Sequence, residues 1–215
     1  DYCVRMTPGQ PLSMFWGYKA LGVDPETGMI QYEDHNQDGK ITNADKHYIG
    51  NANPLFTAGM TNAVTWKGLS LRVLMTASVG NDIYNASKID LVGMCSGANQ
   101  ITDVLRRCRI PDQITVSPES NEIDNLKTST ILIEDGSYLK IKNITLSYNI
   151  THPALKKANI ARIQPYVTLD NMITFTNYSG YDPEMSQYTS ATSMGIDWGT
   201  YPCVRSVVFG VNIDF

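Results

Sequence analysis

Strict alternation of apolar and polar residues over two neighbouring stretches is the feature that most constrains this chain. From Phe56 to Trp66 the apolar side chains fall mainly on even positions, and from Leu69 to Val79 they fall mainly on odd positions. A period of two residues is typical of a β-strand with one apolar face. Because only Lys67-Gly68 separates the two stretches, the sequence predicts a tight β-hairpin.

Further strands follow the same pattern. Alternation indicates strands at residues 138–150, 163–169 and 207–215, and the opening residues "YCVRM" also read as a strand that is already under way. In the first of these, the apolar parity changes near Lys142-Asn143, and a β-bulge there would absorb the change. At 215 residues with 18% charged side chains, the chain is expected to form one structural unit, and its start suggests a fragment of a longer protein.

The connections between these strands are unequal in length. Residues 18–53, 81–137 and 176–202 form three long connections, whereas Lys67-Gly68 and residues 151–162 are short. Because antiparallel neighbours alternate in direction, the long connections are predicted at one end of the sheet and the short ones at the other. Outer-membrane barrels have this arrangement, with short periplasmic turns and long extracellular loops. The predicted fold is therefore all-β, a set of strands from a large antiparallel transmembrane β-barrel with long extracellular loops.

Charge and motif content exclude several function classes. The formal net charge is −4, and Lys and Arg are scattered along the chain, so a nucleic-acid partner is not expected. No run approaches the ~18 apolar residues of a membrane helix. Nucleotide-binding and nucleophile-elbow motifs are absent, and His35, His47 and His152 are isolated in the sequence, which leaves zinc sites and catalytic triads without support. We expect no enzymatic activity.

The stretch "DHNQDGKITNAD" has the spacing of a calcium-binding loop. Gly39 falls at loop position 6, where a sharp turn is needed, and Ile41 falls at the hydrophobic position 8. The entering helix of an EF-hand is missing, because the preceding "MIQYE" looks extended. The predicted ligands, at positions 1, 3, 5, 7, 9 and 12, are Asp34, Asn36, Asp38, the Lys40 carbonyl, Thr42 and Asp45.

Oxygen ligands in this number favour Ca²⁺ over Mg²⁺, with a structural role in stiffening the loop. The final acid is Asp45 rather than Glu, and its shorter side chain reaches an ion only singly or through water. The alternative is a solvated cluster of Asn, Asp and Gly turns without an ion, which is common in long loops.

The four cysteines leave two interpretations open. Cys95 and Cys108 share one long connection that would face an oxidising compartment, where a disulfide can form. Without geometry, two free thiols remain an equal alternative. Cys3 and Cys203 lie in or beside predicted strands.

Seven sequence blocks occur in this order along the chain: "GYKALGVD", "YEDHNQDGKITNAD", "IGNANPLFTAGMTN", "GNDIYN", "IEDGSYLKIKNITLSY", "TFTNYSGYDPE" and "GIDWGTYPCVRSVVFGVNIDF". Together they resemble the C-terminal part of SusC/RagA-type TonB-linked outer-membrane transporters of Bacteroidota. The resemblance covers nearly the whole chain.

The resemblance implies more than the residues show by themselves. It implies a barrel of about 22 strands with an internal plug, energised by TonB through an N-terminal region, and a SusD-like surface lipoprotein that delivers glycans or peptides. This chain would supply C-terminal strands of the wall, in contact with outer-membrane lipid and with the rest of the barrel. The plug and the TonB-contacting region would lie outside it. The expected location is the bacterial cell outer membrane.

A second hypothesis comes from a different class of protein. A soluble β-module stiffened by calcium, used for glycan binding or adhesion, would also combine alternating strands with the loop at residues 34–45. The residues upstream of Asp1 would separate the two. Further strands and a plug-like domain indicate transport, whereas a signal peptide directly before Asp1 indicates a secreted module.

Overall fold

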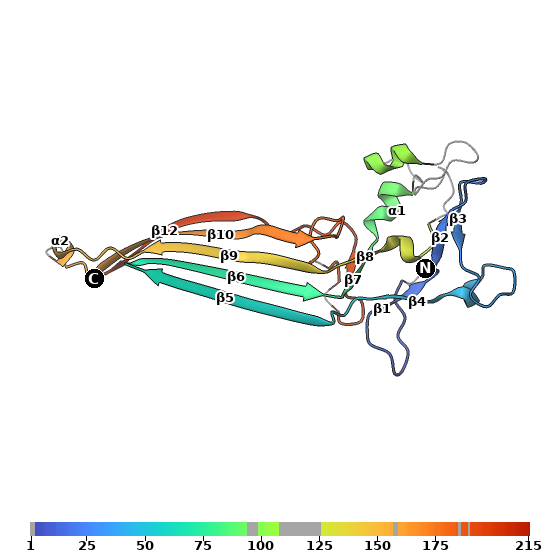
Figure 1. The fold of residues 1–215 in the computed structure, drawn as a ribbon, viewed down its shortest axis with the longest axis horizontal. Coiled ribbons are helices and arrows are strands. Elements are labelled where there is room, and N and C mark those ends of the chain that lie inside the picture. Colours follow the sequence, from blue (N-terminus) through green and yellow to red (C-terminus); the bar gives the residue numbers. More distant parts are fainter. Residues whose placement is uncertain (1–2, 94–98, 108–125, 157–158, 185, 189) are drawn as a thin grey trace. The chain divides into compact units, whose positions relative to one another are not determined.

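The computed structural model describes residues 3–93, 99–107, 126–156, 159–184, 186–188 and 190–215 (Figure 1). In place of the single unit expected from the sequence, the chain divides into two compact units. The strand unit comprises Leu55–Val79, Ser137–Asn177 and Pro202–Phe215. The loop unit comprises Asp1–Pro54, Gly80–Gly136 and Tyr178–Tyr201.

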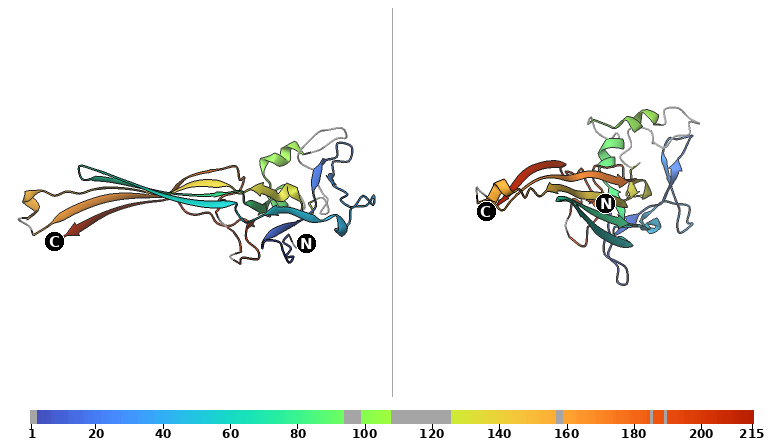
Figure 2. Two further views of the ribbon diagram at one scale, coloured as in Figure 1. Left: turned by 60° about the horizontal axis from the view of Figure 1, so that its bottom comes forward. Right: turned by 60° about the vertical axis from the view of Figure 1, so that its left-hand side comes forward.

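The strand unit is a five-stranded antiparallel sheet with the order β12-β10-β9-β6-β5 (Figures 1 and 2). The predicted hairpin is confirmed, and its two connecting residues have left-handed backbones, with φ 47° at Lys67 and φ 88° at Gly68. Two residues with positive φ are what a type I′ hairpin turn requires. The strands are β5 (Phe56–Trp66), β6 (Leu69–Val79), β9 (Tyr138–Tyr148), β10 (Arg162–Thr176) and β12 (Ser206–Asp214).

The predicted β-bulge is also confirmed. Between β6 and β9, Leu74 pairs with Asn143, and the next residue, Met75, pairs with Ile141. Lys142 is therefore the extra residue. The register between β9 and β10 shifts at the same place. Because one extra residue reverses the side-chain parity, the bulge keeps apolar residues on one face along the whole of β9.

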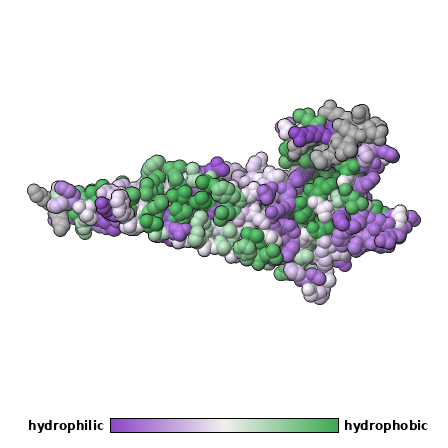
Figure 3. Space-filling view, viewed as in Figure 1, coloured by the Kyte–Doolittle hydropathy of each residue, from purple (hydrophilic) through white to green (hydrophobic). Residues whose placement is uncertain are grey.

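One face of this sheet is mainly apolar on all five strands. Residues paired directly across an antiparallel sheet share a face. One such row consists entirely of apolar side chains, and Phe209 in it is 79% exposed. Figure 3 shows apolar residues gathered over these strands. The row runs through Phe209, Val167, Leu146, Leu71 and Val64.

The opposite face is polar and hydrogen-bonded. Thr145 and Thr168 lie opposite each other, with their hydroxyl oxygens 3.1 Å apart. Asn143 Nδ2 donates to one carboxylate oxygen of Asp170 at 2.8 Å, and Ser206 Oγ donates to the other at 2.9 Å. The register therefore places most polar side chains on this face and most apolar side chains on the other, with exceptions such as Leu74 and Val208 here and Asn62 on the apolar face.

Strand direction sorts the connections by length, as predicted. β5, β9 and β12 begin at the end of the sheet where β6 and β10 finish. The chain leaves this end through the long segments of the loop unit. At the other end, the connections are Lys67-Gly68 and the segment that carries the short helix α2 (Pro153–Lys156).

The loop unit is built from short elements drawn from three parts of the chain. Its small sheets pair β1 with β4, β2 with β3, and β11-β7-β8, in which β11 runs parallel to β7. Its strands are β1 (Met14–Gly17), β2 (Ala20–Val23), β3 (Ile30–Tyr32), β4 (His47–Asn51), β7 (Asp82–Asn85), β8 (Ile133–Asp135) and β11 (Ile196–Asp197). Its helical segments are η1 (Asn43–Asp45), α1 (Ser87–Val92), η2 (Thr102–Arg106) and η4 (Thr130–Leu132).

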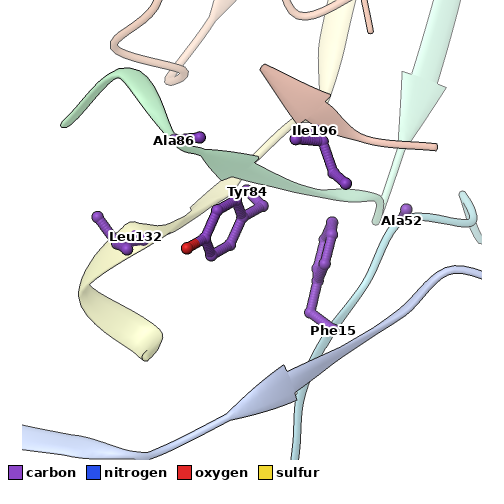
Figure 4. Packing of buried hydrophobic residues seen from close by; sticks show 6 residues of the cluster. All are labelled: Phe15, Ala52, Tyr84, Ala86, Leu132 and Ile196. Atoms are coloured by element: carbon purple, nitrogen blue, oxygen red, sulfur yellow. The ribbon is translucent and has the colours of Figure 1, made fainter. Parts of the chain in front are cut away.

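A hydrophobic core of its own holds the loop unit together (Figure 4). Phe15 and Leu132 are fully buried, and the rings of Phe15 and Tyr84 lie 6.0 Å apart. The segments expected as long loops therefore fold into a packed structure. The core cluster is Phe15, Ala52, Tyr84, Ala86, Leu132 and Ile196.

The start of the chain differs from the sequence-based expectation of a strand. Within the described residues of "YCVRM", Val4 forms only an isolated bridge with Phe15. Phe15 belongs to the four-residue strand β1, and the pairing of Val4 with it does not continue along that strand. Among the described residues, no helix has the length and apolar character needed to cross a membrane.

Gly210 gives a test of the sheet packing. Gly210 lies opposite Tyr166, and a Cβ atom at Gly210 would overlap the Tyr166 ring. Overpacking of this kind costs roughly 1–3 kcal/mol. We expect Gly210→Ala to lower the folded fraction of the full-length protein, measured as heat-modifiable barrel on a gel.

Gly59→Ala is the matched control, because Gly59 lies on the same face and a Cβ atom there would have no neighbour within 4 Å. It should leave the folded fraction unchanged or slightly raised. Equal losses in the two variants would contradict the packing of Tyr166 over Gly210.

Candidate functional site

The calcium-type stretch from Asp34 to Asp45 connects β3 to β4 in the loop unit. It ends in η1, whose N-cap is Thr42, and the Thr42 hydroxyl accepts a hydrogen bond from the N–H of Ala44 at 3.2 Å. Gly39 has a φ of 79°, which matches the sharp turn expected at loop position 6. The predicted stretch is thus a closed loop, with one end tied by a short helical turn.

Asp45 is the centre of this loop, and its side chain is fully buried. One carboxylate oxygen accepts the N–H groups of His35 at 3.1 Å and Asn36 at 3.3 Å. The other accepts the N–H of Thr42 at 2.7 Å. These hydrogen bonds, that from Thr42 above all, hold the pKa of Asp45 below its usual range, although burial acts in the opposite direction. Asp45 therefore closes the loop as an ionised carboxylate.

The first half of the loop is organised by its other acids. The Asp34 carboxylate accepts the N–H of Asp38 at 3.2 Å and of Gly39 at 2.7 Å. The Asn36 side chain donates to Asp38 at 3.0 Å, and Asp38 in turn accepts the N–H of Lys40 at 2.8 Å. The bond from Lys40 to Asp38 is an Asx-turn contact, and the longer-range bonds to Asp34 keep the loop compact.

The predicted ligands have the oxygen atoms that a hard cation requires, but their carboxylates do not converge on one point. All six supply oxygen atoms, as Ca²⁺ requires. Among the described residues, the carboxylates of Asp34, Asp38 and Asp45 do not converge into a group able to hold an ion. Binding would have to exchange some of the hydrogen bonds within the loop for bonds to the ion. The calcium assignment stays a prediction.

His35 and His47 are far apart in the sequence and are expected from it to be isolated. That expectation is wrong for these two residues, because the structure brings them together. The rings of His35 and His47 are stacked, with centroids 4.8 Å apart and an interplanar angle of 20°. With Glu33 they form a group whose potential ligand atoms all lie within 4.8 Å of one another. No zinc-motif spacing signals this group in the sequence, because closure of the loop creates it.

The structure also shows the surroundings of the Cys3 thiol and of the Asp182 carboxylate. Burial raises the pKa of the Cys3 thiol, which therefore stays protonated and weakly nucleophilic at neutral pH. The Asp182 carboxylate accepts the N–H of Glu184 at 3.1 Å, as in an ordinary Asx turn. Cys95 and Cys108 lie outside the described residues, so their pairing stays open.

A partly buried polar network joins distant segments of the loop unit. Glu134 accepts hydrogen bonds from Asn85 at 3.0 Å and from the backbone N–H of Ser179 at 2.8 Å, and it pairs with Lys88 at 2.7 Å. Burial alone would raise the pKa of Glu134, but the bonds from Lys88 and Ser179 lower it overall. This network ties β7, α1 and β8 to the segment after β10, which indicates a structural role.

An open cleft of about 820 Å³ lies in the loop unit, beside its core. Its described lining is mainly apolar and aromatic and includes Tyr84, Ile196 and Trp198. An apolar lining of this kind suits a nonpolar or aromatic group better than a charged one.

Comparison with known proteins gives a consistent picture. No family model matches the chain. Two TonB-dependent receptors of Formosa agariphila align with nearly the whole chain: receptor P3 is 29% identical over 96% of it, and receptor P26 is 23% identical over 98%. Receptor P39 of the same organism is 29% identical over 87% of the chain. The chain spans only 22% of receptor P3 and 23% of receptor P26.

Solved structures show the same fold. The chain aligns over its whole length with a protein in the structure of the RagAB peptide transporter, with a TM-score of 0.81 and 22% identity, and it covers 25% of that protein. The closed-closed state of the RagAB peptide importer gives a TM-score of 0.78 at the same identity. Over nearly its whole length the chain is therefore similar to TonB-dependent receptors, and its strands have the fold of the matching part of the β-barrel in the RagAB transporter.

Proposed function

We propose that this segment forms part of the barrel wall and of the extracellular loops of a TonB-dependent importer of glycans or peptides, which acts with a SusD-like surface lipoprotein. The observation that carries the proposal is the two-faced sheet. Its apolar face suits lipid, and its hydrogen-bonded polar face suits a water-filled or plugged barrel interior.

The sorting of the connections supports an orientation in the membrane. Barrels of the outer membrane have short periplasmic turns and longer extracellular loops. The end of the sheet that carries Lys67-Gly68 would therefore face the periplasm. The three segments of the loop unit would then be extracellular, where a substrate or a surface lipoprotein can reach them.

The partner and the substrate class rest on the matched proteins. The structural relatives form the RagAB peptide transporter, and the sequence relatives are named TonB-dependent receptors. None of these names describes an enzyme. A segment with this fold would thus contribute to import through the rest of the barrel, its plug and TonB.

The lipid-facing assignment is tested by two adjacent valines on β12. Val207 pairs with Leu169 on the apolar face, and Val208 pairs with Thr168 on the polar face. Their side chains are similarly exposed, at 51% and 45%. Leu169 is the central residue of β10, so the neighbouring Val207 side chain would lie deep in the bilayer.

We expect Val207→Arg in the full-length receptor to destabilise the barrel by about 2–4 kcal/mol, as charges on the lipid face do near the bilayer midplane. Val208→Arg should have a much smaller effect. The measurement is the amount of folded, heat-modifiable barrel in isolated outer membranes. Equal losses for both variants, or a larger loss for Val208→Arg, would contradict the assignment of the faces.

The behaviour of the isolated segment separates the importer from a soluble calcium-stiffened module. Residues 1–215 alone would leave two unpaired sheet edges and an apolar face in contact with water, and both promote aggregation. Without detergent, the segment should elute as aggregates in size-exclusion chromatography. A monodisperse monomer with cooperative unfolding would instead favour the soluble module.

Calcium binding by the loop from Asp34 to Asp45 is a separate part of the proposal. Without a cation, the negative charges of its three aspartates repel each other, and an ion would draw them together. We expect EDTA to speed proteolysis between Gly22 and Gly50 in the full-length receptor. Barrel unfolding should change little, because the strands hold one another through their own hydrogen bonds.

Asp38→Ala should reproduce the effect of EDTA and make added Ca²⁺ ineffective. Lys40→Ala is the control, since the predicted ligand at this position is the backbone carbonyl and not the side chain. Mass spectrometry of the fragments gives the cleavage rates. If the rates are equal with Ca²⁺, with EDTA and in Asp38→Ala, the stretch is an ordinary turn cluster.

A further inference from the structure

Glu33, His35 and His47 form a group of potential metal ligands distinct from the predicted oxygen ligands of the calcium-type loop. Glu33 and His35 follow β3, and His47 is the first residue of β4. Their ligand atoms all lie within 4.8 Å of one another, and the two imidazole rings are stacked. The three side chains are therefore assembled before any ion arrives.

Asp45 positions both histidines. Its buried carboxylate accepts the backbone N–H of His35 at 3.1 Å, which holds that residue beside the start of β4. Its backbone carbonyl lies 3.2 Å from Nδ1 of His47. With Nδ1–H as the donor, the tautomer of His47 has a free lone pair on Nε2. Metal-binding histidines are commonly oriented by such a hydrogen bond from the ring nitrogen that does not bind the ion.

The mixed nitrogen and oxygen donors select the kind of ion. Two imidazoles and one carboxylate suit Zn²⁺ and similar transition-metal ions, whereas Ca²⁺ and Mg²⁺ prefer oxygen donors alone. One carboxylate oxygen of Glu33 is paired with Lys19 at 3.0 Å. A single oxygen is sufficient for a carboxylate ligand, so this ion pair can persist and orient the Glu33 side chain.

The distances require only side-chain adjustment. In a tetrahedral zinc site with bonds of about 2.1 Å, neighbouring ligand atoms lie about 3.4 Å apart. The stacked rings must tilt so that their nitrogen lone pairs converge on one point. The His35 side chain is exposed and can rotate toward His47 and Glu33 without disturbing the core.

We propose that Glu33, His35 and His47 bind a Zn²⁺-type transition-metal ion that fastens the two ends of the connection between β3 and β4. Three protein ligands leave a fourth position for water. The site joins Glu33 and His35, which follow β3, to His47, the first residue of β4. Its effect is to hold the loop closed at its base, independently of any cation among the aspartates.

The test is isothermal titration of the full-length receptor in detergent with Zn²⁺, after removal of metals by a chelator. His35→Gln and His47→Gln should each weaken binding by roughly 10- to 100-fold or more. His152→Gln is the matched control, because His152 lies in the short connection before α2, outside this group. Unchanged affinity in His35→Gln and His47→Gln, or an equal loss in His152→Gln, would overturn the proposal.

A second measurement needs no variant. Diethyl pyrocarbonate modifies accessible histidines, and peptide mass spectrometry reports each one separately. Zn²⁺ should protect His35 and His47 but not His152, and protection of all three or of none would contradict the site. The calcium proposal is separable, since Asp38→Ala should abolish the response to Ca²⁺ and leave Zn²⁺ binding intact.

Discussion

The structure depends first on the pairing register of the five-stranded sheet. Residues opposite each other share a face, so rows such as Phe209, Val167 and Leu146 can be apolar only if every strand keeps the same parity. The bulge at Lys142 preserves that parity where the sequence of β9 changes phase. A slip by one residue would move threonines onto the apolar face and leucines onto the polar face. The two-faced character of the sheet therefore rests on backbone register.

The same sheet explains why this small segment contains a second packed unit. Antiparallel order sends every long connection away from one end of the sheet. Because these segments start from the same end of the sheet, they are held near one another and can pack together. They bury Phe15, Tyr84 and Leu132 in a shared core and join Glu134 to Lys88 and Ser179. Long connections built in this way present a defined surface.

Within that unit, Asp45 connects the candidate sites. The sequence analysis treats it as the last ligand of a calcium loop, and the structure shows a buried carboxylate that closes the loop on backbone N–H groups. The two roles are related, because the hydrogen bonds that Asp45 accepts from backbone N–H groups at both ends of the loop also bring the side chains at those ends close together. The stacked pair of His35 and His47 is a product of that closure.

The sequence by itself determined the strands, the Lys67-Gly68 hairpin, the bulge at Lys142 and the sorting of the long connections. Each depends on local alternation or on turn residues, which act over a few positions. Only the tertiary structure decided that the long connections form a core and that His35 meets His47, while Val4 makes a bridge instead of a strand. The core and the bridge depend on contacts between distant segments, and the histidine pair depends on how the loop closes. No period or motif in the sequence encodes those distances.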